Sequence, residues 1–139
     1  MKKGYTLIEL LVAISIIGIL SSIAMVSLTD AKLKANDAKR KADIYQVRTA
    51  LMLYNLDKGQ YPVCASFASD EPRTDCWNNS VEANNLKSAL SQYIQLPLDP
   101  KDSGLYKYAY SSNDGQTFKI KYYLERPSTD ANPQILTGN

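Results

Sequence analysis

The hydrophobic and polar positions of this chain fall into two regions with different patterns. The first is a run without any charged residue, from Leu10 to Thr29, preceded by one carboxylate, Glu9, and by Lys2 and Lys3. About twenty residues at ~1.5 Å each span roughly 30 Å as a helix, the thickness of one hydrocarbon core. The run therefore predicts a membrane-spanning helix, and the two lysines predict a cytoplasmic N-terminus.

The second region turns polar but keeps a helical pattern. No proline or glycine occurs between Gly18 and Gly59. Apolar side chains recur there at spacings of three and four, at Ile44, Val47, Leu51 and Tyr54, after a face of small residues at Ala31, Ala35, Ala38 and Ala42. The pattern predicts one continuous helix from about Tyr5 to Leu56, apolar in its first half and amphipathic in its second, with Gly59 near its C-terminal end.

The chain after residue 80 predicts a short helix and a β-hairpin. Apolar spacing predicts the helix over Val81–Gln95, and prolines follow it. Tyrosines alternate with other residues over 106–110, and apolar residues alternate with polar ones over 118–124, with the turn residues Asn113–Gly115 between them. This arrangement predicts an antiparallel hairpin with an aromatic face that forms core against the amphipathic half of the helix.

The tail from Glu125 to Asn139 has little periodicity and is predicted to be irregular, with Ile135 and Leu136 as candidates for a return to the sheet. The elements together predict an α+β fold. A long N-terminal helix, with an apolar transmembrane half and an amphipathic half, packs against a small globular domain that holds a short helix and an antiparallel β-hairpin or sheet.

Composition and charge narrow the possible functions. Sixteen basic and fourteen acidic side chains give a formal charge of +2, which gives no support for nucleic-acid binding. The chain has no histidine, which excludes serine–histidine and cysteine–histidine catalysis and most zinc sites, and its carboxylates are scattered, so we expect no enzymatic activity. The basic run Lys39–Lys41 is predicted to form a solvated helix face because Asp37 and Asp43 flank it, and a phosphate or lipid contact is the alternative.

Two cysteines, Cys64 and Cys76, lie in the polar stretch well past the apolar run. One pair in a segment outside the cytosol predicts a disulfide, and two free thiols are the alternative. The disulfide would close a polar loop of about a dozen residues next to Trp77.

The N-terminal stretch departs from two common patterns. A secretory signal places a small-residue cleavage site after its apolar run, whereas here Gly4 comes before the run and directly after the lysines. A plain membrane anchor would explain the length of the run but neither Gly4 nor Glu9, because a lone carboxylate at mid-bilayer costs roughly 2.5–3.5 kcal/mol.

The stretch KGYTLIELLVAISIIGIL, from Lys3, resembles the processing and anchoring signal of type IV prepilins and of the pseudopilins of type II secretion. The resemblance implies a leader peptide at residues 1–4, a transmembrane and filament-core half of the helix at 5–29, and a pilin-like globular domain at 30–139. It also implies cleavage after Gly4 by a prepilin peptidase and N-methylation of the new N-terminal residue, Tyr5, where phenylalanine is the usual residue.

The resemblance further implies a role for Glu9 in assembly. In the family, this glutamate neutralises the N-terminal amine of a neighbouring subunit as the helix enters a growing filament. Pairing two charges that would each be costly in a low dielectric both favours insertion and sets the axial register. The alternative to an assembly role is that the Glu9 carboxylate lies among lipid headgroups near the start of the helix.

Two later segments, ALMLYNLDKGQYP and LPLDP, resemble those of major pseudopilins, so the resemblance implies the major pseudopilin of a type II secretion system. The implied partners are further copies of the chain in a helical filament, the prepilin peptidase, and the assembly ATPase and platform proteins. The implied location is the bacterial inner membrane, crossed once with the N-terminus cytoplasmic, and then a periplasmic or surface filament.

Two other functions stay open at this point. A type IV pilus major pilin is the first, because the cysteine-closed loop and the altered tail resemble pilins, and a single-pass membrane-anchored binding protein is the second. No cofactor is expected. Calcium is the one candidate ion, because major pseudopilins often bind it near the C-terminus, yet no EF-type spacing occurs. The available carboxylates are Asp99, Asp102, Asp114 and Asp130, and none is assigned as a ligand.

Overall fold

The computed structural model describes residues 4–64, 76–77, 86–126 and 132–139, apart from the side chain of Val26. The chain forms two compact units, Met1–Ala35 and Asn36–Asn139. The predicted loop over residues 65–75 and the start of the predicted helix at Val81–Gln95 lie outside the described residues.

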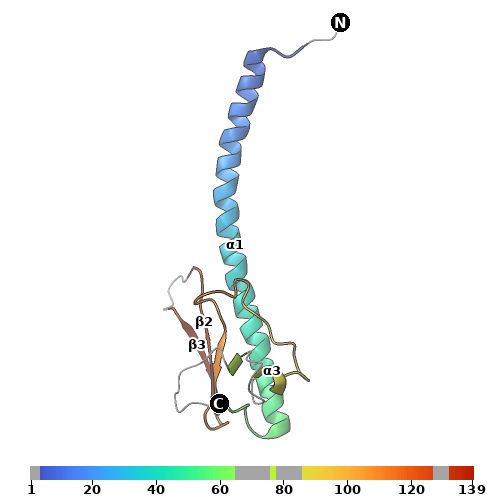
Figure 1. Ribbon diagram of the computed structural model, residues 1–139, viewed down its shortest axis with the longest axis vertical. Coiled ribbons are helices and arrows are strands. Elements are labelled where there is room, and N and C mark those ends of the chain that lie inside the picture. Colours follow the sequence, from blue (N-terminus) through green and yellow to red (C-terminus); the bar gives the residue numbers. More distant parts are fainter. Residues whose placement is uncertain (1–3, 65–75, 78–85, 127–131) are drawn as a thin grey trace. The chain divides into compact units, whose positions relative to one another are not determined.

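A single long helix, α1, runs over Leu7–Lys58 (Figure 1). It is one continuous helix because no proline occurs within it and Gly18 is its only glycine. Gly59 ends it in a left-handed conformation, at φ +74°, and donates its N–H to the carbonyl of Asn55 at 2.7 Å. This is a glycine C-cap, and both predicted ends of the helix are confirmed to within two residues.

The unit Asn36–Asn139 contains a three-stranded antiparallel sheet in the order β1–β2–β3 (Figure 1). Its strands are β1 (Ala109–Ser111), β2 (Phe118–Tyr122) and β3 (Gln134–Gly138). Tyr110 lies opposite Ile120, which in turn lies opposite Leu136. The predicted hairpin is confirmed.

The prediction of an irregular tail is wrong for Gln134–Gly138, which forms β3. Both Ile135 and Leu136 return to the sheet, but Leu136 packs against the core whereas Ile135 is exposed. Gly138 lies opposite Phe118, and a Cβ at this position would overlap the Phe118 ring. The pairing therefore depends on a glycine and on a distant strand, and neither shows as periodicity in a five-residue segment.

The turn between β1 and β2 is held by Asp114. Its carboxylate accepts hydrogen bonds from the backbone N–H groups of Gln116, at 2.9 Å, and Thr117, at 3.2 Å. These two hydrogen bonds lower the pKa of the Asp114 carboxyl below its usual value. Gly115 follows at φ +70°, a conformation that glycine adopts without strain.

The core lies between the sheet and the C-terminal part of α1. Ile44, Val47 and Leu51 of α1 are buried together with the aromatic residues of the strands. Edge-to-face ring pairs join Tyr61 with Phe118, at 4.8 Å between centroids, and Trp77 with Tyr108, at 5.1 Å. The prediction that the aromatic stripe of the hairpin is a core face is confirmed, and such pairs add to the free energy gained by burial alone.

Residues 86–95 of the helix predicted over Val81–Gln95 are described, and they are helical only in part. Helix α3 covers Leu86–Ala89, and turns with hydrogen bonds to the third residue back follow it, such as Tyr93 N–H to the carbonyl of Leu90 at 2.9 Å. Leu86 and Leu90 are both buried in the core. Two side chains one turn apart are enough to anchor this segment without a longer helix.

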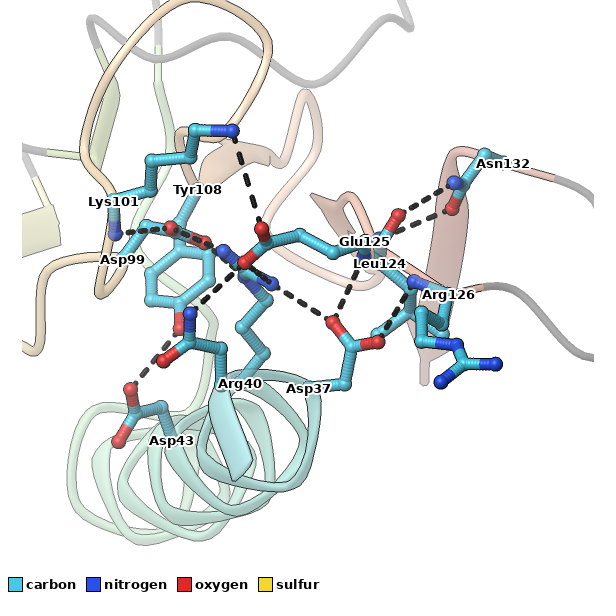
Figure 2. Close-up of polar contacts among 11 residues, drawn as sticks. Asp37, Arg40, Asp43, Asp99, Lys101, Tyr108, Leu124, Glu125, Arg126 and Asn132 are labelled. Atoms are coloured by element: carbon cyan, nitrogen blue, oxygen red, sulfur yellow. Dashed lines mark hydrogen bonds and ion pairs between the residues drawn. The ribbon is translucent and has the colours of Figure 1, made fainter. Parts of the chain in front are cut away.

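A buried arginine, Arg40, joins α1 to two other segments of the unit (Figure 2). Its guanidinium binds both oxygens of Asp99, at 2.7 and 2.9 Å. The same guanidinium reaches Asp37 at 2.8 Å and Glu125 at 2.9 Å. A bidentate pair with a planar carboxylate is the strongest geometry that an arginine offers.

The prediction that Lys39–Lys41 forms a solvated helix face is therefore wrong for Arg40, whose exposed fraction is 0%. Asp37 and Asp43 do not neutralise the lysines at the surface, because both turn inward. Asp37 accepts the backbone N–H groups of Glu125 and Arg126 at 2.9 Å each, and Asp43 accepts the hydroxyl of Tyr108 at 3.0 Å. The partners of these two aspartates lie far away along the chain, so the sequence around residue 40 does not show that both are buried.

Burial and hydrogen bonding within this cluster shift the pKa values of Arg40 and Tyr108. Burial by itself lowers the pKa of Arg40, but the hydrogen bonds to its carboxylates, Asp99 foremost, outweigh that effect and hold the pKa above its usual value. Burial, followed by the nearby Asp43 carboxylate, raises the pKa of Tyr108, so the phenol stays protonated and donates to Asp43. At neutral pH, Arg40 is therefore ionised and Tyr108 is neutral.

We predict that Arg40→Met lowers the free energy of unfolding by about 3–5 kcal/mol, because it leaves buried carboxylates without a cation. Thermal and denaturant unfolding of the full-length protein in detergent, followed by near-ultraviolet circular dichroism, measures this. The exposed neighbour Lys41 provides the control, and Lys41→Met is expected to change stability by less than about 0.5 kcal/mol. Equal effects of the two substitutions would contradict a structural role for the buried guanidinium.

Candidate processing and assembly segment

Residues Gly4–Glu9 comprise the three residues before α1 and the first three residues of that helix, in the unit Met1–Ala35. Gly4, Tyr5 and Thr6 precede the helix and are exposed, and Glu9 lies in its first turn. The Glu9 carboxylate accepts two hydrogen bonds from Thr6, one from the backbone N–H at 2.8 Å and one from the hydroxyl at 2.7 Å. The Thr6 hydroxyl in turn accepts the N–H of Glu9 at 3.3 Å.

This reciprocal arrangement is a capping box, in which Thr6 is the N-cap residue and Glu9 the third helical residue. The sequence analysis missed this role for Thr6, although the spacing Thr-x-x-Glu before an apolar run signals it. Within one chain, Glu9 therefore caps its own helix. Both hydrogen bonds go to Oε2, so Oε1 stays available for a group from outside the chain.

Gly4 has no steric reason to be glycine. A Cβ added there would meet no atom within 4 Å beyond its chain neighbours, and its φ is not among the positive values of the chain. Packing within the described residues therefore does not explain the glycine at this position. Recognition of the backbone by another protein is the kind of constraint that leaves this pattern.

The apolar part of α1 is exposed on all sides. Every large apolar side chain named here has an exposed fraction of 51% or more: Leu7, Ile8, Leu10, Leu11, Val12, Ile14, Ile16, Ile17, Ile19, Leu20, Ile23, Met25 and Leu28. Among the described residues, α1 is one helix long and apolar enough to cross a membrane. A helix that is apolar all round needs lipid or other helices around it.

Four of the five hydroxyl groups in this apolar segment are satisfied within the helix. They donate to backbone carbonyls about one turn earlier: Ser15 to Leu11, Ser22 to Ile19, Ser27 to Ile23 and Thr29 to Met25. An unsatisfied hydroxyl would be costly in hydrocarbon, and these bonds remove that cost. The segment is thus suited to an apolar environment despite its polar side chains.

The carboxylates considered for calcium do not converge. Asp99 is buried against Arg40, Asp114 holds the hairpin turn, Asp102 is exposed, and Asp130 lies outside the described residues. No group of three or more potential ligands of the metal-binding types occurs in the part of the chain that the structure describes.

The two cysteines, Cys64 and Cys76, form a disulfide bridge, as predicted. Cys76 and the adjacent Trp77 are buried in the core, and the Trp77 indole N–H donates to the carbonyl of Pro97 at 3.0 Å. The Cys64 N–H donates to the carbonyl of Ser112, next to the end of β1, at 3.1 Å. The bridge therefore ties the segment after α1 to the hydrophobic core.

The N-terminal part of the chain matches a known protein family. Residues 1–25 match the family model of the prokaryotic N-terminal methylation motif. The type II secretion system core protein G of Escherichia coli is 41% identical over 105 residues, which cover 71% of this chain and 66% of that protein. The predicted resemblance to pilins and pseudopilins is confirmed.

Two further relatives are a second secretion protein and a fimbrial protein. The type II secretion system core protein G of Pectobacterium carotovorum is 39% identical over 61 residues, 44% of this chain and 39% of that protein. A fimbrial protein of Neisseria meningitidis is 28% identical over 90 residues, 65% of this chain and 53% of that protein. The similarity to the secretion proteins is higher than that to the fimbrial protein.

The matched region covers between 39% and 66% of the length of the first three secretion relatives, less than two thirds of each. No solved structure matches the chain.

We predict that the disulfide stabilises the fold of this pseudopilin-like chain. Trp77, its only tryptophan, serves as the fluorescent probe of unfolding. Replacing both cysteines by serine is expected to lower the free energy of unfolding by about 3 kcal/mol, because the unfolded chain is no longer constrained. Denaturant unfolding of the full-length protein, followed by tryptophan fluorescence, measures this. Reduction of the native protein should produce the same loss, and a midpoint unchanged by both treatments would contradict the prediction.

Proposed function

We propose that this chain is a structural subunit of a pilus-like filament and that it serves as the major pseudopilin of a type II secretion system. The observation that carries the proposal is the N-terminal segment as a whole: Gly4 without a packing role, Glu9 at the head of the helix, and an apolar helix exposed on all sides. The higher similarity to the secretion proteins favours the pseudopilin assignment over the pilin.

In this proposal, the subunit is first inserted into the bacterial inner membrane. The chain inserts once with its N-terminus cytoplasmic, and a prepilin peptidase cuts after Gly4 and the new N-terminus at Tyr5 is methylated. Residues 1–4 are the leader, residues 5–29 cross the membrane, and residues 30–139 form the globular part with the amphipathic half of the helix. The partners are further copies of this chain, the peptidase, the assembly ATPase and the platform proteins.

Assembly rests on Glu9 in this proposal. Cleavage creates an α-amino group on Tyr5, and the Glu9 Oε1 that receives no hydrogen bond from Thr6 can pair with the amine of a neighbouring copy. Both charges would be costly if they entered an apolar filament core unpaired. Their pairing therefore favours the correct axial offset between copies over all others.

The energetics of assembly require an external motor. Helices in lipid gain little from apolar contact with each other, because the lipid tails are equally apolar. Once the subunits leave the membrane, burial of the exposed apolar part of α1 among its copies stabilises the filament. Extraction is the costly step, and we assign it to the ATPase and platform proteins rather than to this chain.

A type IV pilus major pilin is the second candidate function, favoured by the similarity to the fimbrial protein and by the disulfide. Deletion of the gene distinguishes the two candidates. Loss of secreted proteins with normal motility and adhesion supports the pseudopilin, and the reverse supports the pilin. Surface fibres seen by electron microscopy after overexpression occur in either case and test only filament formation.

A membrane-anchored binding protein without processing is the third candidate. Mass spectrometry of the purified protein separates it from the first two, because an intact Met1 would be retained. A methylated Tyr5 at the start of the mature chain would support the filament subunit. We propose no enzymatic role, since the relatives are named as secretion and fimbrial proteins and the chain has no histidine.

We predict that Gly4→Glu blocks leader removal, because a long charged side chain takes the place of a residue without a side chain at the proposed cut site. The fold should be unaffected, since a side chain at position 4 meets open space. Co-expression with a prepilin peptidase, followed by gel mobility and intact mass, measures the cleaved fraction. Gly18→Ala, within the helix, is the control and should be cleaved normally. Normal cleavage of Gly4→Glu would exclude the proposed site.

We predict that Glu9→Gln is cleaved and inserted but lowers the association constant for assembly by roughly a hundredfold or more, because a buried amine loses its counter-charge. Glutamine keeps an oxygen that can accept the Thr6 N–H, so this substitution separates charge pairing from helix capping. Yield of sheared filaments and electron microscopy measure assembly. If Glu9→Gln assembles normally while Glu9→Ala does not, capping and not charge pairing explains the glutamate.

A further inference from the structure

The part of α1 that follows the apolar run carries exposed lysines without acidic partners. Four lysines of this part have no ion-pair partner among the described residues: Lys32, Lys34, Lys39 and Lys41. Two of them lie four residues from an aspartate on the same helix, Lys41 from Asp37 and Lys39 from Asp43, a spacing at which ion pairs form readily. Neither of these two ion pairs occurs, although all four residues are described.

Both aspartates belong to the buried polar cluster instead (Figure 2). Asp37 binds the Arg40 guanidinium at 2.8 Å and two backbone N–H groups at the start of the tail. Asp43 accepts the hydroxyl of Tyr108 at 3.0 Å. Each aspartate is only 8% exposed, whereas the lysines beside them in the sequence lie at the surface. The fold therefore removes two negative charges from the surface of this helix and leaves the lysine charges without neutralisation.

The surface charge of this stretch is strongly positive as a result. Between Asp30 and Lys41, four exposed cations are accompanied by one exposed anion, Asp30, which has an interaction of its own. Arg40 does not add to the surface charge, because it is fully buried among carboxylates. An exposed positive stretch of this kind attracts an anionic partner from outside the chain.

The lysines begin where the apolar run ends. The run ends at Thr29, and Lys32 and Lys34 follow it after three and five residues. At ~1.5 Å per helical residue, these two lie roughly 5–8 Å beyond a hydrocarbon core that the run fills, which is the depth of one headgroup layer. Lys39 and Lys41 follow Thr29 by ten and twelve residues, which is at most about 15–18 Å of helix. They act through water, where charges are screened over about 8 Å at physiological salt.

The lysines also lie on two sides of the helix. Lys32 and Lys34 are two residues apart, which is about 200° around a helix of 3.6 residues per turn, and the same holds for Lys39 and Lys41. A docking protein approaches a helix from one side. A bilayer surrounds the helix and presents phosphate groups on every side. The arrangement therefore fits a membrane surface better than it fits a protein partner.

We propose that these four lysines bind the phosphate groups of anionic phospholipids at the membrane surface where α1 leaves the bilayer. The inference rests on the proposed function, which places residues 5–29 in a membrane. Each lysine close to an anionic membrane surface strengthens the attraction about fivefold. Lysine suits this contact because its apolar stem can lie along the helix while its ammonium group reaches the headgroups. Extraction of the subunit then has to break these contacts in addition to removing the apolar run from lipid.

Lipid binding by the full-length chain tests this contact. The protein in a neutral detergent is mixed with equal amounts of phosphatidylglycerol and phosphatidylcholine that have the same acyl chains, and native mass spectrometry counts each bound lipid. We expect the native chain to retain phosphatidylglycerol over phosphatidylcholine by about fivefold or more. A roughly tenfold increase in ionic strength should reduce this preference, because the lysines are exposed and their charges are screened.

Matched double substitutions locate the contact. Lys32→Gln combined with Lys34→Gln should lower the preference for phosphatidylglycerol at least about fivefold. Lys58→Gln combined with Lys87→Gln removes the same charge from two other exposed lysines and should leave the preference unchanged. All four side chains are exposed, so the melting temperature should match that of the native chain in both variants. An equal loss in the two variants would show attraction by net charge alone and would overturn the proposal.

The second pair of lysines tests the distance dependence. Lys39→Gln combined with Lys41→Gln should lower the preference by roughly twofold, less than the first pair, because these lysines are farther from the apolar run. Lys2 and Lys3 are the same in every version of the chain, so the differences report only on the substituted lysines. A larger effect of the second pair than of the first would contradict the placement of the contact at the end of the apolar run.

A soluble competitor separates a membrane surface from a site for a free anion. Glycerol phosphate at millimolar concentration should not displace phosphatidylglycerol, and displacement would overturn the proposal. Equal binding of the two lipids by a native chain that stays embedded in membranes overturns the lipid contact and leaves the proposed function intact. A native chain that is washed from membranes without detergent overturns both.

Discussion

One helix in this chain has to suit two different environments, and most features of the structure follow from that constraint. In its first part, α1 is apolar all round, and four of its serine and threonine hydroxyls bond to backbone carbonyls about one turn earlier, as an apolar environment favours. In its second part, the same helix has to cover a core, and Val47 and Leu51 are fully buried there. The helix meets both demands because no proline interrupts it.

The unit Asn36–Asn139 has a buried charged group in addition to its apolar core. Arg40 is fully buried, and such a cation is tolerated only because carboxylates from three segments surround it. Asp37 then binds the backbone of residues 125 and 126, and Asn132 bonds to both backbone groups of Leu124. These contacts hold the tail beside β2, where β3 pairs with it. The third strand thus depends on the polar cluster as well as on apolar burial.

Glu9 caps its own helix in this structure, in addition to the assembly role that we propose for it. Its Oε2 caps the helix through Thr6, and its Oε1 has no partner within the described part of the chain. The capping box is visible in the sequence as Thr-x-x-Glu before an apolar run. The local role uses Oε2, and the proposed assembly role would use Oε1, so the two would not compete.

The sequence by itself determined the features that depend on local patterns. These are the long helix and its glycine cap, the aromatic hairpin, the disulfide and the N-terminal motif, because spacing, turn residues and a specific motif signal each of them. The tertiary structure alone decided that Arg40 is buried, that the tail forms β3 and that Asp37 and Asp43 turn inward. Each of these depends on partners dozens of residues away, and a buried ion pair looks the same in sequence as a solvated one.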